Sequence, residues 1–276
     1  MSQTIIKTEN LCYQSGRRFL VDHINWEVKK GEHWLVFGLN GCGKTTLLSM
    51  IAGFRSSTSG DVTVLGQAFG NENILKLRQK IGWVSSSFFD KYYSQESALN
   101  IVLSGLSGTF GLDPRAITNQ QIRRARAILQ ELRMGNFMNT PFNLMSKGER
   151  QNILIARALI AQPEVLILDE PCTGLDIYAQ AHMIDTINQL AMNTSTTIIY
   201  VTHQPEEIRP FLNKTLLLRN GKIFAQGDTK DMISSDMLSD LLQQPVTAYW
   251  HENGRLTLDI QAPSRISTLC YPQVMQ

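Results

Sequence analysis

The sequence lacks the features that mark secreted, membrane-spanning or disulfide-stabilised proteins. No apolar run approaches the ~18 residues of a membrane span, and the first residues lack the basic stretch and apolar core of a secretory signal. The four cysteines have neither close pairing nor metal-ligand spacing, which argues against disulfide and zinc frameworks. We therefore expect a cytoplasmic protein that touches a membrane only through another chain, with reduced, buried thiols at Cys12 and Cys270.

The sequence also lacks a strong excess of charge of either sign. Its 26 Lys and Arg residues nearly balance 24 Asp and Glu residues, for a formal net charge of +2. Such a balance gives no strong nucleic-acid signal and no field that would gather anionic lipid. Apolar residues are plentiful at 43% of 276 residues, enough to bury one sizeable core.

Strand-like and helix-like segments alternate through most of the chain. Short apolar runs bounded by turn residues predict strands, and apolar residues spaced three and four apart predict helices. This alternation is typical of a parallel sheet with helices on its faces and predicts an α/β fold. The predicted strands lie at 34–37, 61–66, 80–84, 165–168, 197–201 and 214–218, and the predicted helices lie at 44–52, within 94–134, from Ser146, from Ile177 and after Pro205.

The two ends of the chain depart from this alternation. Residues 4–37 are strand-like throughout, with a turn at Lys30-Gly31. Beyond Asp228, the segments VTAYWH and RLTLDI flank Glu252-Asn253-Gly254 and predict an appended hairpin. We place a boundary near residue 228, followed by a small C-terminal β appendage.

The segment GLNGCGKTT at residues 38–46 fits the phosphate-loop pattern, after a predicted strand and at the start of a predicted helix. Its glycines let successive backbone N–H groups point at one anion, and the helix N-terminus adds partial positive charge. Lys44 can reach the β- and γ-phosphates, and the hydroxyl of Thr45 can ligate Mg²⁺. The alternative is an ordinary glycine-rich turn that caps a helix. The predicted nucleotide-binding residues are Gly38, Asn40, Gly41, Cys42, Gly43, Lys44, Thr45 and Thr46.

Two carboxylates end the apolar segment VLILDEP at residues 165–171. A strand end of this kind lies at the carboxyl edge of the sheet, where open α/β sheets bind ligands. We predict that Asp169 holds Mg²⁺ and that Glu170 activates the attacking water as a general base. The alternative is a strand-end turn with two solvated charges.

In their order along the chain, these motifs resemble those of the ATP-binding cassette (ABC) ATPases over about residues 5–227. The resemblance implies a P-loop NTPase core with a mostly parallel sheet, an N-terminal antiparallel β subdomain and a helical subdomain at about 90–160. It implies an ATP-binding domain at 1–227 and a C-terminal extension at 228–276. The segment IGWVSSSF, followed by ALNIVLSG, is similar to a bacterial subgroup in which some members are associated with molybdate uptake.

The segment MSKGE at 145–149 stands where the family carries its signature loop, approximately LSGGQ, and departs from it at Met145, Lys147 and Glu149. The resemblance implies that Ser146, Gly148 and Glu149 face a nucleotide held by a second cassette, with two ATP molecules between two chains. Ser146 and Glu149 also form an S-x-x-E capping box, which accounts for them structurally. Both interpretations can hold, because a capped helix N-terminus offers N–H groups to a phosphate.

Three further positions match the family pattern. Asp176 ends TGLD, which stands at the family's D-loop, and His203 ends a strand where the family has a switch histidine that touches the γ-phosphate. Tyr13 stands where the family stacks an aromatic ring on adenine, a contact that needs only a flat π-face. A packed strand tyrosine is the alternative for Tyr13.

One departure concerns the residue after the strand at 80–84. The family usually has a glutamine there that ligates Mg²⁺ and couples the site to a partner, whereas this chain has Ser85 and Ser86. A serine side chain is shorter, so we expect altered metal ligation or altered coupling. Gln95 is close in sequence, but we assign it no role.

Cys42 lies inside the phosphate loop. Backbone N–H groups and Lys44 should favour its thiolate when nucleotide is absent, which leads to the hypothesis that oxidants inhibit the ATPase.

These features together predict an ATPase subunit of a bacterial importer that uses ATP and Mg²⁺, forms a homodimer and docks on separate membrane permease subunits. The alternative is a cassette ATPase that acts on nucleic acid, the ribosome or a regulatory partner without a permease. The serines at 85 and 86 favour this alternative, whereas the single phosphate loop and the absence of a coiled-coil insertion count against it. A P-loop kinase would leave MSKGE, Asp176 and His203 unexplained.

Overall fold

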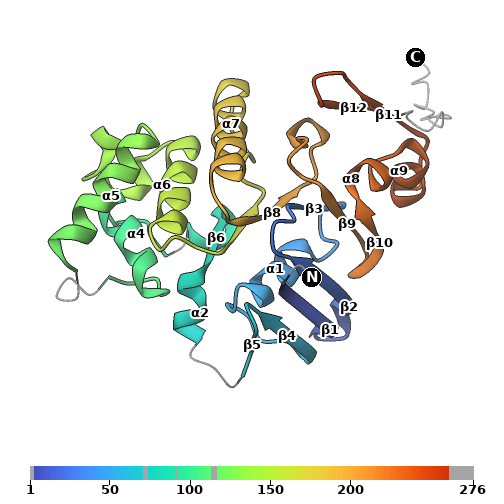
Figure 1. Cartoon of the computed structure of the whole chain (residues 1–276), viewed down its shortest axis with the longest axis horizontal. Coiled ribbons are helices and arrows are strands. Elements are labelled where there is room, and N and C mark those ends of the chain that lie inside the picture. The colour runs from blue at the N-terminus through green and yellow to red at the C-terminus, as the bar shows by residue number, and fades with distance from the viewer. Residues whose placement is uncertain (1–2, 71–73, 91, 113–116, 261–276) are drawn as a thin grey trace, which may run out of the picture.

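A mostly parallel sheet forms the centre of the computed structural model, which describes residues 3–70, 74–90, 92–112 and 117–260. A second sheet lies beside it near the N-terminus, a group of helices extends beyond one edge, and the C-terminal elements lie beyond the other (Figure 1). Within the described residues, no helix is both long and apolar enough to cross a lipid bilayer.

The central sheet has six strands in the order β10-β9-β3-β8-β7-β6, and all its neighbours are parallel except the pair β9 and β10. Every residue of β3, β6, β7 and β8 is buried, which explains their continuous apolar sequences. The strands are β3 (Trp34–Phe37), β6 (Ile81–Ser85), β7 (Val165–Asp169), β8 (Thr197–Thr202), β9 (Lys214–Arg219) and β10 (Lys222–Asp228). The predicted α/β fold with a mostly parallel sheet is confirmed.

The register of this sheet brings distant strand ends together. Ser85 pairs with Asp169, and Asp169 pairs with Val201 on the next strand. Phe37, the last residue before the glycine loop, pairs with Thr202. The carboxyl ends of β3, β6, β7 and β8 therefore lie at one edge, where the phosphate loop also begins.

The second sheet is antiparallel, in the order β2-β1-β4-β5. In β2, exposed and buried positions alternate from His23 to Lys29, as expected for a sheet with one face on the core. The strands are β1 (Thr4–Ser15), β2 (Arg18–Lys29), β4 (Ser59–Val64) and β5 (Gln67–Ala68). The antiparallel β part that the resemblance implied is therefore present.

Helices α4, α5 and α6 pack on one another as a helical lobe beyond β6 (Figure 1). A cluster of aromatic rings, which includes Phe54, Trp83, Phe88, Phe89 and Phe110, lies between the sheet and this lobe. The helices outside the C-terminal region are α1 (Lys44–Ile51), α2 (Ile74–Lys80), α3 (Ser86–Phe89), α4 (Ala98–Ser104), α5 (Asn119–Glu131), α6 (Lys147–Leu159) and α7 (Ile177–Asn193).

The C-terminal region holds more helix than the sequence predicted. The expected hairpin is present as β11 (Val246–Trp250) and β12 (Leu256–Ile260), but α8 (Thr229–Met232) and α9 (Ser235–Leu242) precede it. Leu238 and Leu241 are buried on one face of α9, and Ser234 caps its first turn, a pattern too short to stand out in sequence. Cys270 lies outside the described residues.

The helix expected after Pro205 is wrong. The segment Pro205–Glu207 forms a single 3₁₀ turn, and the chain is extended again at Ile208. The side chain of Glu207 is buried and accepts a hydrogen bond from the hydroxyl of Tyr200 on β8. This tertiary contact fixes the segment, which does not continue as a helix.

Candidate functional site

The glycine loop connects β3 to α1 and approaches other backbone segments closely. Gly43 has a φ of 107°, and a Cβ atom there would collide with the carbonyl oxygen of Leu20 on β2. A Cβ atom at Gly38 would collide with the carbonyl oxygen of Leu218 on β9. Glycine is therefore required at both positions, as the phosphate-loop pattern predicts.

Lys44 is buried at the start of α1 and folds back over the loop. Its Nζ atom donates hydrogen bonds to the carbonyl oxygens of Gly38 at 2.8 Å and Leu39 at 3.2 Å, and lies 3.8 Å from Oε1 of Glu170. The ammonium group thus lies between the loop and the acidic strand end. The hollow at the mouth of the loop is lined by Leu20, Asn40, Gly41, Gly43, Lys44, Thr45, Thr46 and Glu170.

Asp169 ends β7 and is bound by two hydroxyl groups. Thr45 Oγ1 donates to Asp169 Oδ1 at 3.2 Å, and Ser85 Oγ donates to Asp169 Oδ2 at 3.1 Å. Burial raises the pKa of Asp169 to about 6, partly offset by these two hydrogen bonds. The fold brings together the two predicted metal ligands, Thr45 and Asp169. Hard oxygen donors around a buried carboxylate that lacks a bonded cation fit a Mg²⁺ ion.

Ser85 therefore holds the carboxylate of Asp169, a contact that the sequence did not reveal. The signal was available in principle, because Ser85 ends β6, a strand that neighbours β7, but only the strand register shows that it meets Asp169. The side chain of Ser86 lies outside the described part of the structure.

Glu170 is oriented from two sides. Its Oε1 lies 3.1 Å from Nδ1 of His203, and its Oε2 accepts a hydrogen bond from Thr173 Oγ1 at 3.2 Å. Its backbone is left-handed, with φ of 52°, a conformation that non-glycine residues rarely adopt outside functional or turn positions. The fold thus brings the predicted catalytic residues Glu170 and His203 into contact and adds Thr173 as a further partner of Glu170.

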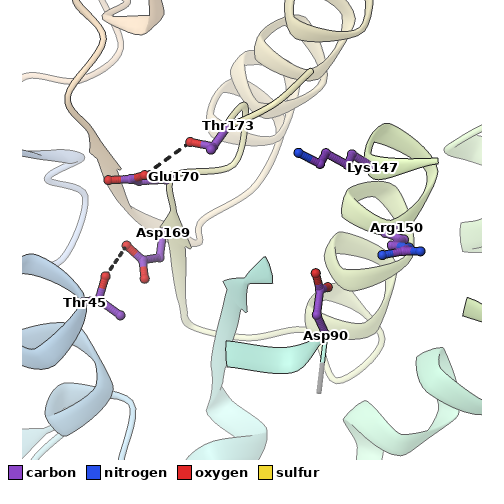
Figure 2. Close-up of a pocket in the computed structure, with 7 residues that line it drawn as sticks. All are labelled: Thr45, Asp90, Lys147, Arg150, Asp169, Glu170 and Thr173. Atoms are coloured by element: carbon purple, nitrogen blue, oxygen red, sulfur yellow. Dashed lines mark hydrogen bonds between the residues drawn. The ribbon is translucent and has the colours of Figure 1, made fainter. Parts of the chain in front are cut away.

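A pocket opens beside the acidic pair, and its far wall belongs to the helical lobe (Figure 2). Thr45, Asp169, Glu170 and Thr173 line one side, and Asp90, Lys147 and Arg150 line the other. Burial raises the pKa of Asp90, and the nearby Arg150 and Lys147 cations act in the opposite direction. The sequence analysis missed Asp90 and Arg150, because nothing local distinguishes them from other surface charges.

The predicted signature residues form a local cap in this chain. The backbone N–H of Ser146 donates to Oε2 of Glu149 at 2.7 Å, and that of Glu149 donates to Oγ of Ser146 at 3.3 Å, so the capping box at the start of α6 is confirmed. Gly148 faces Leu175, where a Cβ atom would make only an ordinary contact. Asp176 caps α7 through the backbone N–H of Ala179 at 2.8 Å. Among the described residues, these four do not line the loop's hollow or the pocket beside Asp169.

Tyr13 lies on β1, near the loop but already in contact with a cation. It pairs with Val21, next to Leu20, whose carbonyl oxygen packs on Gly43. The guanidinium of Arg55 lies 4.7 Å from the ring centroid and donates to the hydroxyl of Tyr13 at 2.7 Å. One ring face is thus covered by a cation, a contact typical of cation–π pairs.

The hypothesis of a reactive Cys42 thiolate is wrong. Burial raises the pKa of this thiol, and the opposing effects of Lys44 and of backbone N–H groups are smaller. Only 6% of Cys42 is exposed, because the side chain lies beneath the loop and near Gly38. A protonated, enclosed thiol is a poor target for oxidants.

The ABC transporter family model matches residues 21–173. The chain is 39% identical to the uncharacterized ABC transporter ATP-binding protein YlmA of Bacillus subtilis, over 90% of this chain and 95% of that protein. It is 33% identical to the molybdate import ATP-binding protein MolC of Haemophilus influenzae, over 87% and 89% of the two chains.

Solved structures resemble the chain along nearly its full length. A metal-chelate type ABC transporter in an inward-facing conformation superposes with a TM-score of 0.74 at 28% identity, covering 94% of this chain and 98% of that chain. A dimeric bacterial ABC transporter cassette superposes with a TM-score of 0.71 at 25% identity, covering 81% and 98%.

Proposed function

Because the chain belongs to the ABC transporter ATP-binding family, we propose that it is the ATP-hydrolysing subunit of a bacterial importer, works as a homodimer and docks on separate permease subunits. Binding and hydrolysis of ATP are its general activity.

One observation carries the catalytic part of the proposal: Glu170 lies between His203 and Lys44, beside the carboxylate of Asp169. Glu170 acts as the general base and accepts a proton from the attacking water through a carboxylate oxygen. His203 and Thr173 hold this carboxylate in one orientation. Thr45 and Asp169 would hold Mg²⁺, which supplies positive charge to the transferring phosphoryl group.

The phosphates belong at the mouth of the loop. The backbone N–H groups from Gly38 to Thr46 bind them, and Lys44 exchanges its contacts with the carbonyl oxygens of Gly38 and Leu39 for contacts with phosphate oxygens. Tyr13 stacks on the adenine ring through the ring face opposite Arg55.

Exposed apolar side chains near the phosphate loop, the signature loop and the D-loop support a dimer. Leu39 is 57% exposed, Leu144 73%, Ile177 88% and Tyr178 80%. Large apolar side chains this exposed, on the segments that bind nucleotide, are suited to a protein interface. A second cassette would cover them and place its nucleotide against Ser146, Gly148, Glu149 and Asp176 of this chain.

The similarity to MolC, a molybdate import protein, supports import over other roles. We assign residues 1–227 to the ATP-binding domain, with a helical subdomain at about 90–160, and residues 228–276 to a C-terminal extension. The end of β10 at Asp228 supports this division. Through its permease, the subunit would lie on the cytoplasmic face of the membrane.

Co-purification from membranes tests the transport assignment. The tagged Glu170→Gln variant, with ATP and Mg²⁺ present, should retain an integral membrane protein on the affinity resin, because a stalled dimer holds its permease. Wild-type protein with ADP is the matched control. Recovery of ribosomes or nucleic acid in place of a membrane protein would contradict the proposal and favour a cassette without a permease.

A further inference from the structure

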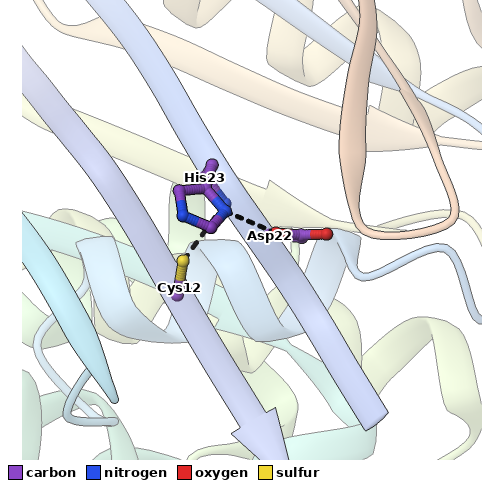
Figure 3. A group of neighbouring side chains, drawn as sticks. All are labelled: Cys12, Asp22 and His23. Atoms are coloured by element: carbon purple, nitrogen blue, oxygen red, sulfur yellow. Dashed lines mark hydrogen bonds and ion pairs between the residues drawn. The ribbon is translucent and has the colours of Figure 1, made fainter.

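Three potential metal ligands of different chemistry lie together on the N-terminal sheet, away from the catalytic carboxylates. Cys12, Asp22 and His23 each place one donor atom within 4.8 Å of the others (Figure 3). We propose that this group, the Cys12–Asp22–His23 cluster, binds a divalent cation with affinity for sulfur, of the zinc class, and that the bound ion restrains the phosphate loop. The second half of this proposal rests on the ATPase function described above.

A β-bulge creates the cluster. The strand register pairs Leu11 with Ile24 and Tyr13 with Val21, so Cys12 alone on β1 faces both Asp22 and His23 on β2. Consecutive side chains of a regular strand point to opposite faces, whereas a bulge redirects one of them. His23 takes up the distortion with a left-handed φ of 52°, and its side chain therefore shares a location with that of Asp22.

The donor set favours a borderline or soft ion. A thiol, an imidazole and a carboxylate are the ligand types that hold Zn²⁺, whereas Mg²⁺ and Ca²⁺ prefer oxygen ligands alone. Three protein ligands also leave room for a water molecule in a tetrahedral shell. His23 is exposed, with 68% of its side chain accessible, so its ring can rotate to meet an entering ion.

The sulfur of Cys12 takes part in two hydrogen bonds with the backbone. The backbone N–H of His23 donates to Sγ at 3.2 Å, and the thiol proton is directed to the carbonyl oxygen of Asn10 at 3.5 Å. When the metal–sulfur bond forms, this proton passes to solvent and the N–H donor remains to stabilise the sulfur's negative charge.

Asp22 is held in place from two sides. The hydrogen bond with His23, at 2.6 Å, lowers the pKa of Asp22, and Lys222 lies 3.3 Å from its other oxygen. Lys222 both fixes the carboxylate and reduces the negative charge of the cluster. The binding free energy of an ion here must therefore come from its bonds to the sulfur and the imidazole as well as from charge attraction.

Two backbone hydrogen bonds connect the cluster to the phosphate loop. The N–H of Asp22 donates to the carbonyl oxygen of Gly221 at 2.8 Å, and the N–H of Gly221 donates to the carbonyl oxygen of Cys42 at 2.9 Å. An ion that fixes Asp22 would therefore restrict the movement of Gly221 and of Cys42, which lies in the phosphate loop. We expect zinc to slow ATP turnover through this connection.

Cobalt binding tests the site directly, without ATP. Wild-type protein titrated with Co²⁺ alone should bind one ion and show the near-ultraviolet charge-transfer band of a cobalt–thiolate bond. The exposed position of His23 suits a His23→Asn variant, because asparagine tolerates left-handed backbone. His23→Asn and Cys12→Ser should each weaken binding at least tenfold.

Matched controls separate this site from other thiols and imidazoles. His251→Asn removes a histidine from the exposed hairpin, and Cys172→Ser removes a buried thiol elsewhere; both variants should bind Co²⁺ like wild type. Equal binding by wild type, His23→Asn and Cys12→Ser, or a spectrum without the charge-transfer band, would overturn the site. If Cys12→Ser fails to fold, the surface variant His23→Asn still decides the question.

Turnover with saturating ATP and Mg²⁺ then tests the connection to the loop. One equivalent of Zn²⁺ should slow wild type and His251→Asn at least threefold and leave His23→Asn unchanged. Zinc binding without any effect on wild-type turnover would overturn the regulatory half and leave the site intact. An inactive wild-type protein that still binds cobalt would contradict the ATPase function and not the metal site.

Discussion

The two walls of the central pocket differ in how their side chains are held by the rest of the chain. On the sheet side, Asp169 and Glu170 are bonded by Thr45, Ser85, Thr173 and His203, which come from separate strands and loops. On the lobe side, Lys147 and Arg150 line the pocket from the first turn of α6, and Ser146 and Glu149 cap the N-terminus of that helix locally. The sheet side is therefore assembled from several segments of one chain, whereas the role that we propose for the lobe side depends on a nucleotide presented by a second chain.

The largest effect should come from the sheet side. Glu170→Gln removes the proton acceptor and should lower ATP turnover by about 10² to 10⁴, while ATP binding persists. Phosphate release measures turnover, and a fluorescent ATP analogue measures binding. Glu164→Gln, at an exposed carboxylate, is the control. Unchanged hydrolysis by the Glu170 variant would remove this residue from the mechanism.

The buried carboxylate of Asp169 should lower the free energy of unfolding of the nucleotide-free protein at neutral pH. Its pKa is raised on folding, so the folded state holds the proton more tightly and stability falls as pH rises from about 4 to about 6. Asp169→Asn removes that loss and should stabilise the nucleotide-free protein at pH 8 by at most about 3 kcal/mol. Below pH 4 the difference should vanish. Urea unfolding at both pH values measures it, and a variant less stable than wild type at pH 8 would refute the reasoning.

Lys44→Ala tests the loop itself. Loss of a charged hydrogen-bond donor to phosphate should weaken ATP binding by about 10- to 100-fold. Lys80→Ala, whose ammonium group lies near Glu164 on the surface, controls for loss of charge. Calorimetric titration with ATP distinguishes the two, and equal affinities would show that Lys44 does not bind nucleotide.

The smallest effect sharpens the comparison on the lobe side. Ser146→Ala and Thr118→Ala each remove the cap from a capping box, at α6 and α5, and each should cost about 1 kcal/mol of stability. Only Ser146→Ala should also reduce ATP-driven dimerisation, because Ser146 adjoins Lys147, which lines the pocket, whereas no residue of α5, the helix that Thr118 caps, lines it. Size-exclusion chromatography with ATP and Mg²⁺ measures this difference. If both variants dimerise equally, Ser146 is a cap and nothing more.

The residues on the sheet side of the pocket could be predicted from the sequence because they lie in contiguous motifs at the ends of strands. The glycine loop, Asp169 and Glu170 each follow an apolar strand whose direction is readable, and parallel strands end at one edge. The capping box of Ser146 and Glu149 was equally local.

Other parts of the site depend on contacts that no local pattern encodes. Ser85 meets Asp169 through strand register, and Asp90 and Arg150 reach the pocket through the packing of the lobe. The protonated state of Cys42 follows from burial, which outweighs the nearby Lys44. The short helix α9 was not predicted because only two of its residues, Leu238 and Leu241, are buried.

The close contact between Gly43 and Leu20 limits how the molecule can move. The carbonyl oxygen of Leu20 lies where any side chain at position 43 would stand, and Gly221 bonds to Cys42 on the neighbouring stretch. Because the backbones of the antiparallel sheet and the glycine loop are in direct contact, we expect the two to move together. We therefore expect a hinge that opens or closes the pocket to lie at its other wall, where the lobe meets the edge of the central sheet.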